Sequence, residues 1–140
     1  MLNITETKVE GTVPVTVLRL DGELDASNYE ALIVQTQALY ADGTRNLLLD
    51  LDKLSFVSSS GLVALHNMAL IMRGETLADA QEGWRAFHAI SQDLGKASGP
   101  EVHFKLLKPQ PLVKKVLDTA GFTTIMTVFE DEETAVASFN

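Results

Sequence analysis

The chain has 140 residues and a formal net charge of −8, from 11 Lys and Arg against 19 Asp and Glu. Its hydrophobic share of 46% is typical of one globular domain over residues 1–140 and excludes a disordered chain. The acidic balance argues against nucleic acid as a direct partner, since phosphate binding needs a basic surface. The absence of cysteine excludes disulfides and cysteine-ligated zinc. We find neither a signal peptide nor an apolar run near the ~20 residues that span a bilayer, so we expect a cytoplasmic protein without membrane contact.

Two strands are expected at the N-terminus, over residues 3–9 and 13–20, with Gly11 in the turn between them. Valines at every second position from 13 to 17 indicate that one face of the second strand is buried. We expect the pair Asp21-Gly22 to end this strand.

A helix is predicted over residues 25–41, where apolar side chains recur with helical spacing. Asp25 is one candidate for its N-cap, and a capping box of Ser27 with Glu30 is the other. The pair Asp42-Gly43 is expected to end the helix.

A nearly continuous apolar run at residues 46–51 predicts a central strand that is covered on both faces. Asp50 and Asp52 flank Leu51 near the expected end of this strand and therefore project to one side. Their simplest role is to cap and solvate the strand end, because a magnesium site would want a third carboxylate nearby. The sequence Ser58-Ser59-Ser60-Gly61 follows, which we call the serine turn, and a helix is predicted over residues 62–72.

The C-terminal part predicts a strand over residues 101–107, then a helix with Pro111 in its first turn. Gly121 followed by Phe122 is typical of the end of a helix. A last strand is expected over residues 124–129, and the acidic residues 130–133 should begin a short helix. Strands that alternate with helices indicate an α/β fold with a mixed, mostly parallel sheet, an N-terminal hairpin and flanking helices.

Residues 73–100 form an additional segment between two of these units. A helix is predicted there over residues 76–94, with Trp84 and Phe87 on its buried side. It would cover the core of this domain or contact a second copy, which makes a homodimer through this segment possible. Four glycines in the segment favour a flexible loop as the alternative.

Catalytic and metal motifs are missing from the sequence. It contains neither of the glycine-rich loops that cradle phosphates, and the serine turn lacks the first glycine of a nucleophile elbow. His66, His88 and His103 do not have the spacing of metal ligands. We therefore predict no catalytic residue, no metal and no cofactor.

The serine turn remains as the candidate site. A helix N-terminus presents unpaired N–H groups and the positive end of the helix dipole. One serine is expected to cap the helix, but capping does not account for three serines and a glycine. The same N–H groups would stabilise a phosphate placed on a serine there.

These features resemble a known family. The segments LDGELDASNYEAL, LLLDLDKLSFVSSSGLVAL and VKKVLDTAGF look like the STAS domain of anti-sigma-factor antagonists, over about residues 1–72 and 101–140. The resemblance implies a non-catalytic protein that binds an anti-sigma factor with serine kinase activity. It also implies that the kinase phosphorylates the first serine of the Ser-Ser-Gly element and that a metal-dependent serine phosphatase reverses the modification.

The resemblance assigns roles to individual residues. Ser59 matches the phosphate acceptor, and Ser60 and Gly61 match the two residues after it. Ser58 stands where the family often has Asp, so Ser58 is the alternative acceptor. By the same resemblance, Asp21 and Asp25 lie on a loop beside the turn and belong to the partner-binding surface with Ser58, Ser60 and Gly61. Helix capping is an equally good explanation of Asp25.

Two other functions are compatible with the sequence. One is a scaffold subunit of a signalling assembly without reversible phosphorylation. The other is a STAS module that binds a small ligand or lipid under the apolar face of residues 77–94.

Overall fold

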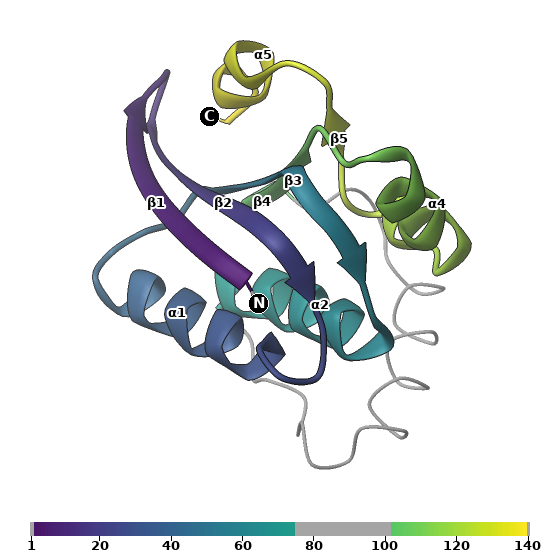
Figure 1. The fold of residues 1–140 in the computed structure, drawn as a ribbon. Coiled ribbons are helices and arrows are strands. Elements are labelled where there is room, and N and C mark those ends of the chain that lie inside the picture. Colours follow the sequence, from purple (N-terminus) through teal and green to yellow (C-terminus); the bar gives the residue numbers. More distant parts are fainter. Residues whose placement is uncertain (1, 75–101, 140) are drawn as a thin grey trace.

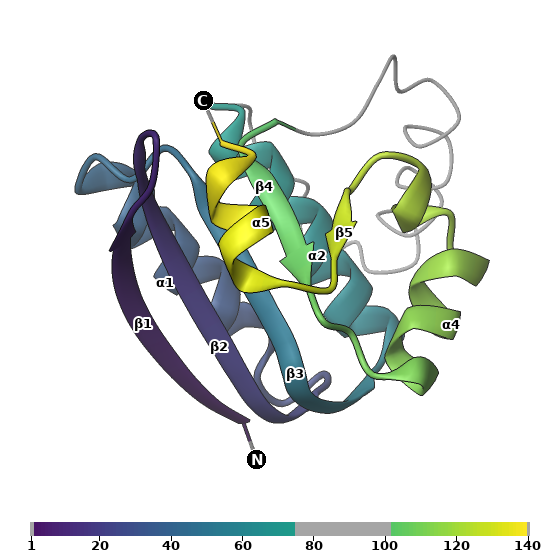
Figure 2. The same cartoon turned by 90° about the horizontal axis from the view of Figure 1, so that it is seen from above.

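The computed structural model describes residues 2–74 and 102–139 of the chain. Most of the additional segment, with the helix expected over residues 76–94 and its Trp84 and Phe87, lies outside the described residues. Within them, five strands form one sheet with helices on both faces, as Figures 1 and 2 show from two directions.

The strands lie in the sheet in the order in which they occur in the chain. They are β1 (Leu2–Glu10), β2 (Pro14–Leu24), β3 (Leu47–Val57), β4 (Phe104–Leu107) and β5 (Val128–Phe129). β1 pairs with β2 as an antiparallel hairpin, and the other neighbours pair in parallel. The predicted mixed, mostly parallel sheet with an N-terminal hairpin is therefore confirmed.

One face of the sheet is covered along its length by α1 (Tyr29–Ala41) and α2 (Ser59–Met72). Leucines of the strands point into this layer, including Leu18, Leu20 and Leu49. We call it the helix-covered face. Every residue of α2 from Gly61 to Met72 is buried.

The opposite face carries α5 (Glu132–Ala137), which covers only part of it (Figure 2). A small apolar cluster lies beneath α5 and is made by Val15, Val17, Leu48, Leu107, Ala135, Val136 and Phe139. The rest of this face is polar, and we call it the open face. α4 (Pro111–Thr119) lies at the β5 side of the molecule and buries Val113 and Leu117 (Figures 1 and 2).

Strands β2 and β3 are longer than the sequence predicted. β2 does not end at Asp21-Gly22 but continues to Leu24, with two irregularities in its register against β3. Gly22 has φ 125°, a backbone conformation that disfavours other residues, so glycine lets the strand pass this irregularity instead of ending it. β3 continues past Leu51 because its further residues pair with this extension of β2.

The start of α1 also differs from the prediction. The helix begins at Tyr29 after the N-cap residue Asn28, and neither Asp25 nor the expected capping box of Ser27 with Glu30 caps it. The Asn28 side chain accepts a hydrogen bond from the Asp25 N–H (3.0 Å) and donates to the Glu23 carbonyl (2.9 Å). These bonds fold residues 25–28 into a turn, which delays the helix.

Three elements of the C-terminal part were predicted with partly wrong bounds. Only Phe104–Leu107 of the expected strand 101–107 pairs with β3. Gly121 is left-handed (φ 84°) at the end of α4, as predicted, but a 3₁₀ turn over Phe122–Thr124 follows. This turn buries Phe122 and includes Thr124, where the last strand was expected to begin. The last strand therefore has only two residues, Val128–Phe129. The acidic helix is confirmed, with Asp131 as its N-cap.

Candidate functional site

The serine turn joins the end of β3 to the start of α2. The Ser58 N–H donates to the Leu24 carbonyl at the end of β2 (2.9 Å). The Ser58 hydroxyl accepts from the Gly61 N–H (3.1 Å) and makes Ser58 the N-cap of α2. One bond attaches the turn to β2 and the other closes the first turn of α2, so the half-buried Ser58 fixes the local backbone.

Gly61 lies where the first turn of α2 approaches both neighbouring strands. A Cβ atom on Gly61 would lie 2.6 Å from Val57 Cγ2 and 3.0 Å from the Leu24 carbonyl oxygen. Real side chains do not tolerate such contacts, so only glycine allows this approach. Gly61 is buried and therefore shapes the turn from inside.

Ser59 is the first residue of α2, and it is exposed. Its hydroxyl makes no hydrogen bond with the residues that the structure describes. The first N–H groups of a helix have no intrahelical partner and carry the positive end of its dipole. Ser59 thus combines an accessible hydroxyl with an environment that stabilises an anion, and the half-buried Ser60 follows it.

Asp25 follows Leu24, the residue whose carbonyl holds the serine turn. Hydrogen bonds from the Ser27 hydroxyl and the Ser27 N–H lower the pKa of the Asp25 carboxyl. Asp25 therefore keeps its negative charge at neutral pH. The structure places this charge on the loop that leaves β2 beside the turn.

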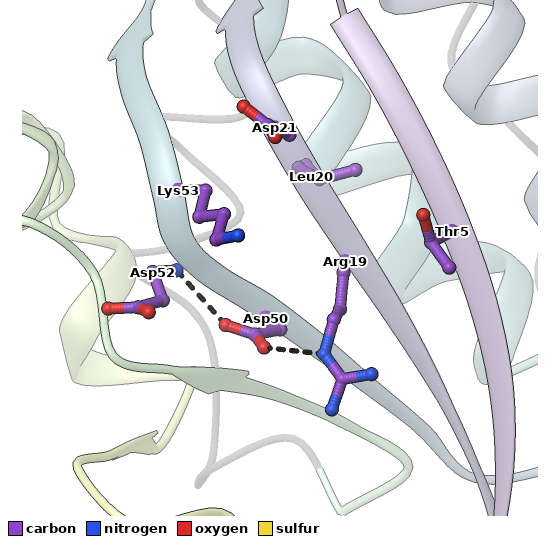
Figure 3. A pocket seen from close by; sticks show the side chains of 7 residues that line it. All are labelled: Thr5, Arg19, Leu20, Asp21, Asp50, Asp52 and Lys53. Carbon is purple, nitrogen blue, oxygen red and sulfur yellow. Dashed lines mark hydrogen bonds and ion pairs between the residues drawn. The ribbon is translucent and has the colours of Figure 1, made fainter.

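Asp21 lies elsewhere, because it belongs to β2 and not to the loop that the resemblance implied. It lines a pocket of about 220 Å³ on the open face, which Figure 3 shows from close by. The lining residues are Thr5, Arg19, Leu20, Asp21, Asp50, Asp52 and Lys53.

Arg19 is the centre of the charged groups around this pocket. Its Nε lies 3.1 Å from an Asp50 carboxylate oxygen, and one of its terminal nitrogens lies 2.7 Å from Glu132 at the start of α5. The second Asp50 oxygen accepts from the Asp52 N–H (3.0 Å; Figure 3). Asp50 and Asp52 thus share one side, as predicted, but they lie within β3 and not at its end.

The sequence analysis did not identify the ion pair of Arg19 with Asp50. Arg19 and Asp50 are direct partners in the parallel register of β2 and β3. The alternation in each strand puts both on the polar face, but only the register brings them together. That register was the missing signal.

Residues 2–74 and 102–139 contain neither a candidate metal site nor a membrane-spanning helix. There, no cluster of His, Asp and Glu side chains could hold a metal ion. His66 is buried in α2, and His103 Nδ1 lies 3.1 Å from Asn46 Oδ1. His88 is outside the described residues. None of the described helices combines the length and the apolar character needed to cross a bilayer.

Comparison with known proteins shows which family the chain is similar to. The model of the STAS domain matches residues 6–73. A Bordetella bronchiseptica protein, the candidate anti-sigma factor antagonist BtrV, is 25% identical over 138 residues, which cover 99% of this chain and 95% of the relative.

Two solved structures share the fold. An anti-sigma factor antagonist from Mycobacterium paratuberculosis is similar with a TM-score of 0.66 and 19% identity, covering 97% of this chain and 94% of that one. The antagonist SpoIIAA in its unphosphorylated form gives a TM-score of 0.60 and 24% identity, covering 96% and 93%. Residues 6–73 therefore match the STAS domain, and the chain has the fold of the anti-sigma factor antagonists.

Proposed function

We propose that this protein is an anti-sigma factor antagonist that binds an anti-sigma factor with serine kinase activity and is released when Ser59 is phosphorylated. The observation that carries the proposal is the difference between neighbouring serines. Ser58 is used as the N-cap of α2, whereas Ser59 is exposed and has no hydrogen bond to a described residue. The likeness to BtrV over almost the whole chain supports it. SpoIIAA, which has this fold, is known in a phosphorylated form.

The geometry favours Ser59 over Ser58 as the acceptor. Modification of Ser58 would remove the hydroxyl that accepts from the Gly61 N–H and would disturb the first turn of α2. Modification of Ser59 breaks no hydrogen bond to the described residues, and its hydroxyl is already accessible. A kinase can thus reach Ser59 without unfolding the helix.

The phosphate changes the surface of the domain more than its fold. It would add about −1.5 to −2 charges at neutral pH, and the free N–H groups of the first turn stabilise such an anion. The fold should therefore persist after phosphorylation. A phosphatase that removes the phosphate would restore the starting surface.

The same charge opposes binding to a partner that is shaped for a neutral hydroxyl. A buried anion without a counter-charge costs several kcal/mol, and ~3 kcal/mol would weaken binding more than a hundredfold. Asp25 carries a negative charge beside the turn in both forms, so the phosphate is the charge that changes between them. The unphosphorylated form would therefore sequester the anti-sigma factor and free its sigma factor.

The roles of the other turn residues follow from their positions. We assign Asp25, Ser59 and Ser60 to the partner-binding surface. Ser58 and Gly61 support that surface from inside the turn, and Asp21 contributes only if the contact extends over the open face. In this mechanism the protein itself needs no catalytic turnover.

The test is the affinity for the anti-sigma factor kinase of the same organism. We expect Ser59→Ala to bind like the wild type and Ser59→Asp to bind at least tenfold more weakly. Gln37→Glu serves as the matched control, since it adds one charge at an exposed position of α1 and should leave binding unchanged. Equal affinity of the Ala and Asp variants, or equal weakening by the control, would contradict the proposal.

A further inference from the structure

Strand β1 forms an outer edge of the sheet. It is first in the strand order and has no neighbour on its far side among the described residues. Its nine residues contain neither proline nor glycine, and its register with β2 runs without a bulge. Natural sheets usually interrupt or shorten such an edge, because it offers free N–H and C=O groups to another strand.

The hydrogen-bond pattern shows which residues of β1 offer these groups. The Thr16 N–H donates to the Asn46 carbonyl (3.0 Å) on the β3 side, so the alternate residues Val15, Val17 and Arg19 turn theirs toward β1. Their partners in the hairpin register are Val9, Thr7 and Thr5. The residues between them, Ile4, Glu6 and Lys8, therefore direct their backbone groups away from the sheet.

We infer that β1 is a self-complementary edge that pairs antiparallel with β1 of a second copy, centred on Thr7. In this two-fold register Glu6 lies opposite Lys8 of the second copy, and Lys8 lies opposite its Glu6. Both residues are exposed, so two opposite-charge pairs form at once. Thr5 meets Val9 of the second copy, which is a favourable pair of β-branched side chains.

Shifted registers lose this complementarity. Centring on Glu6 puts two glutamates opposite each other, and centring on Lys8 puts two lysines opposite each other and Glu6 opposite Glu10. Centring on Val9 again pairs opposite charges, Lys8 with Glu10, but leaves Ile4 and Glu6 beyond the end of the other strand. Only the register centred on Thr7 both pairs opposite charges and lets Ile4, Glu6 and Lys8 use their outward backbone groups. The occupant that fits this edge is therefore another copy of the same strand.

The resulting dimer is weak and depends on concentration. Strand pairing alone buries less than the ~1,200 Å² of a standard stable interface, and the net charge of −8 on each copy opposes association. The dimer would join two sheets through their β1 edges, whereas the serine turn follows β3, the middle strand of the sheet. The inference does not depend on the proposed function.

The inference is tested by exchanging the charges of Glu6 and Lys8. Sedimentation velocity then measures dimer formation from micromolar to millimolar protein. We expect the wild type to dimerise, and Glu6→Lys and Lys8→Glu each to weaken the dimer about tenfold or more, since each replaces two attractive pairs by two repulsive ones. The double variant Glu6→Lys/Lys8→Glu restores both pairs and should recover most of the affinity.

The net charge of each variant separates pairing from general repulsion. Glu6→Lys changes the net charge from −8 to −6, since −8 + 2 = −6. The repulsion between two copies becomes weaker, and this alone would strengthen their association. Glu30→Lys makes the same change on α1 and is the matched control, which should not weaken the dimer. Circular dichroism confirms that each variant is folded.

Amide hydrogen exchange gives a second readout on the wild type. The N–H groups of Ile4, Glu6 and Lys8 should become protected only at concentrations where the dimer forms. Those of Thr5, Thr7 and Val9 should be protected at every concentration. A wild type that stays monomeric to millimolar concentration, equal affinity of all variants, or a folded double variant that does not recover would each overturn the inference.

Discussion

The serine turn and the charged groups around Arg19 are two polar regions of the described structure, and they differ in how their polar groups are used. Around Arg19 the charges are paired with one another, through Asp50 and Glu132. In the serine turn, Ser58 satisfies the backbone while Ser59 remains exposed and without a described hydrogen-bond partner.

The difference shows why charge alone is a poor guide to a binding site. The Arg19 contacts tie α5 to strands β2 and β3 and so serve the fold. Ser59 is neutral and contributes nothing visible to the fold, which leaves it available for a partner or a modification. Substitutions should therefore reduce stability in the first region and leave it nearly unchanged at Ser59.

The largest effect is expected at Gly61, which supports the turn from inside. Gly61→Ala should lower the free energy of unfolding by about 2–3 kcal/mol, because its Cβ would clash with Val57 and the Leu24 carbonyl. Urea unfolding measures this loss. Gly43→Ala is a comparison, since a Cβ there meets no atom within 4 Å, although its positive φ of 105° adds strain. A loss at Gly61 below that at Gly43 would contradict the close packing of the turn.

Arg19→Met should lower the free energy of unfolding by about 1–2 kcal/mol. The variant leaves the mostly buried Asp50 carboxylate without its cation, but Arg19 is partly exposed and solvent screens the loss. Arg45→Met removes the same charge from an exposed residue that stacks on Tyr40, and we expect a smaller loss there. If the two variants are equally stable, the Arg19 contacts do not hold the fold.

Within the serine turn, the neighbouring serines should differ. Ser58→Ala removes the N-cap of α2 and should cost about 1 kcal/mol. Ser59→Ala should change the free energy of unfolding by less than about 0.5 kcal/mol, as expected for an exposed residue outside the packing. Thermal or urea unfolding of both variants compares them directly, and the reverse order would remove the structural reason for choosing Ser59.

The smallest effect concerns Lys105 of β4, which is buried beneath the C-terminal residues. Its ammonium donates to the Ser138 carbonyl (3.1 Å) and hydroxyl (2.9 Å). Burial lowers the pKa of Lys105 from 10.5. The folded protein therefore releases this proton at lower pH than the unfolded chain does.

The sign of the pH dependence follows from this difference. Burying the charged ammonium costs stability at neutral pH, and the cost disappears as the pH rises through the folded pKa toward 10.5. Wild type should thus gain stability relative to Lys105→Met between neutral and alkaline pH. Lys114→Met, at an exposed position of α4, is the control. If the stability of wild type relative to Lys105→Met stays unchanged or falls as the pH rises, the lowered pKa of Lys105 is contradicted.

Much of the fold could be predicted because its pattern is local. The apolar run at 46–51 fixes β3, and helical spacing together with terminal signals such as Pro111 and Gly121 identifies α4. The predictions that were wrong concern features that depend on contacts between segments. Gly22 carries β2 onward only because β3 pairs with it, and α1 starts late because Asn28 bonds to Asp25 and Glu23.

The candidate site could be predicted in part for the same reason. A helix start after three serines indicates a cap and an accessible hydroxyl, but the sequence does not distinguish Ser58 from Ser59 as the cap. That distinction comes from the Leu24 carbonyl and the Gly61 N–H, which fix Ser58. The Arg19–Asp50 pair needs the register of two strands, which no local pattern contains.

The most direct test of the account is to map the phosphate after incubation with the anti-sigma factor kinase and ATP. Wild type, Ser58→Ala and Ser59→Ala are compared by intact mass and by peptide sequencing in the mass spectrometer. The account predicts one phosphate on Ser59 in the wild type and in Ser58→Ala, and none in Ser59→Ala. A phosphate on Ser58, or a Ser59→Ala variant that is still phosphorylated in the turn, would contradict it.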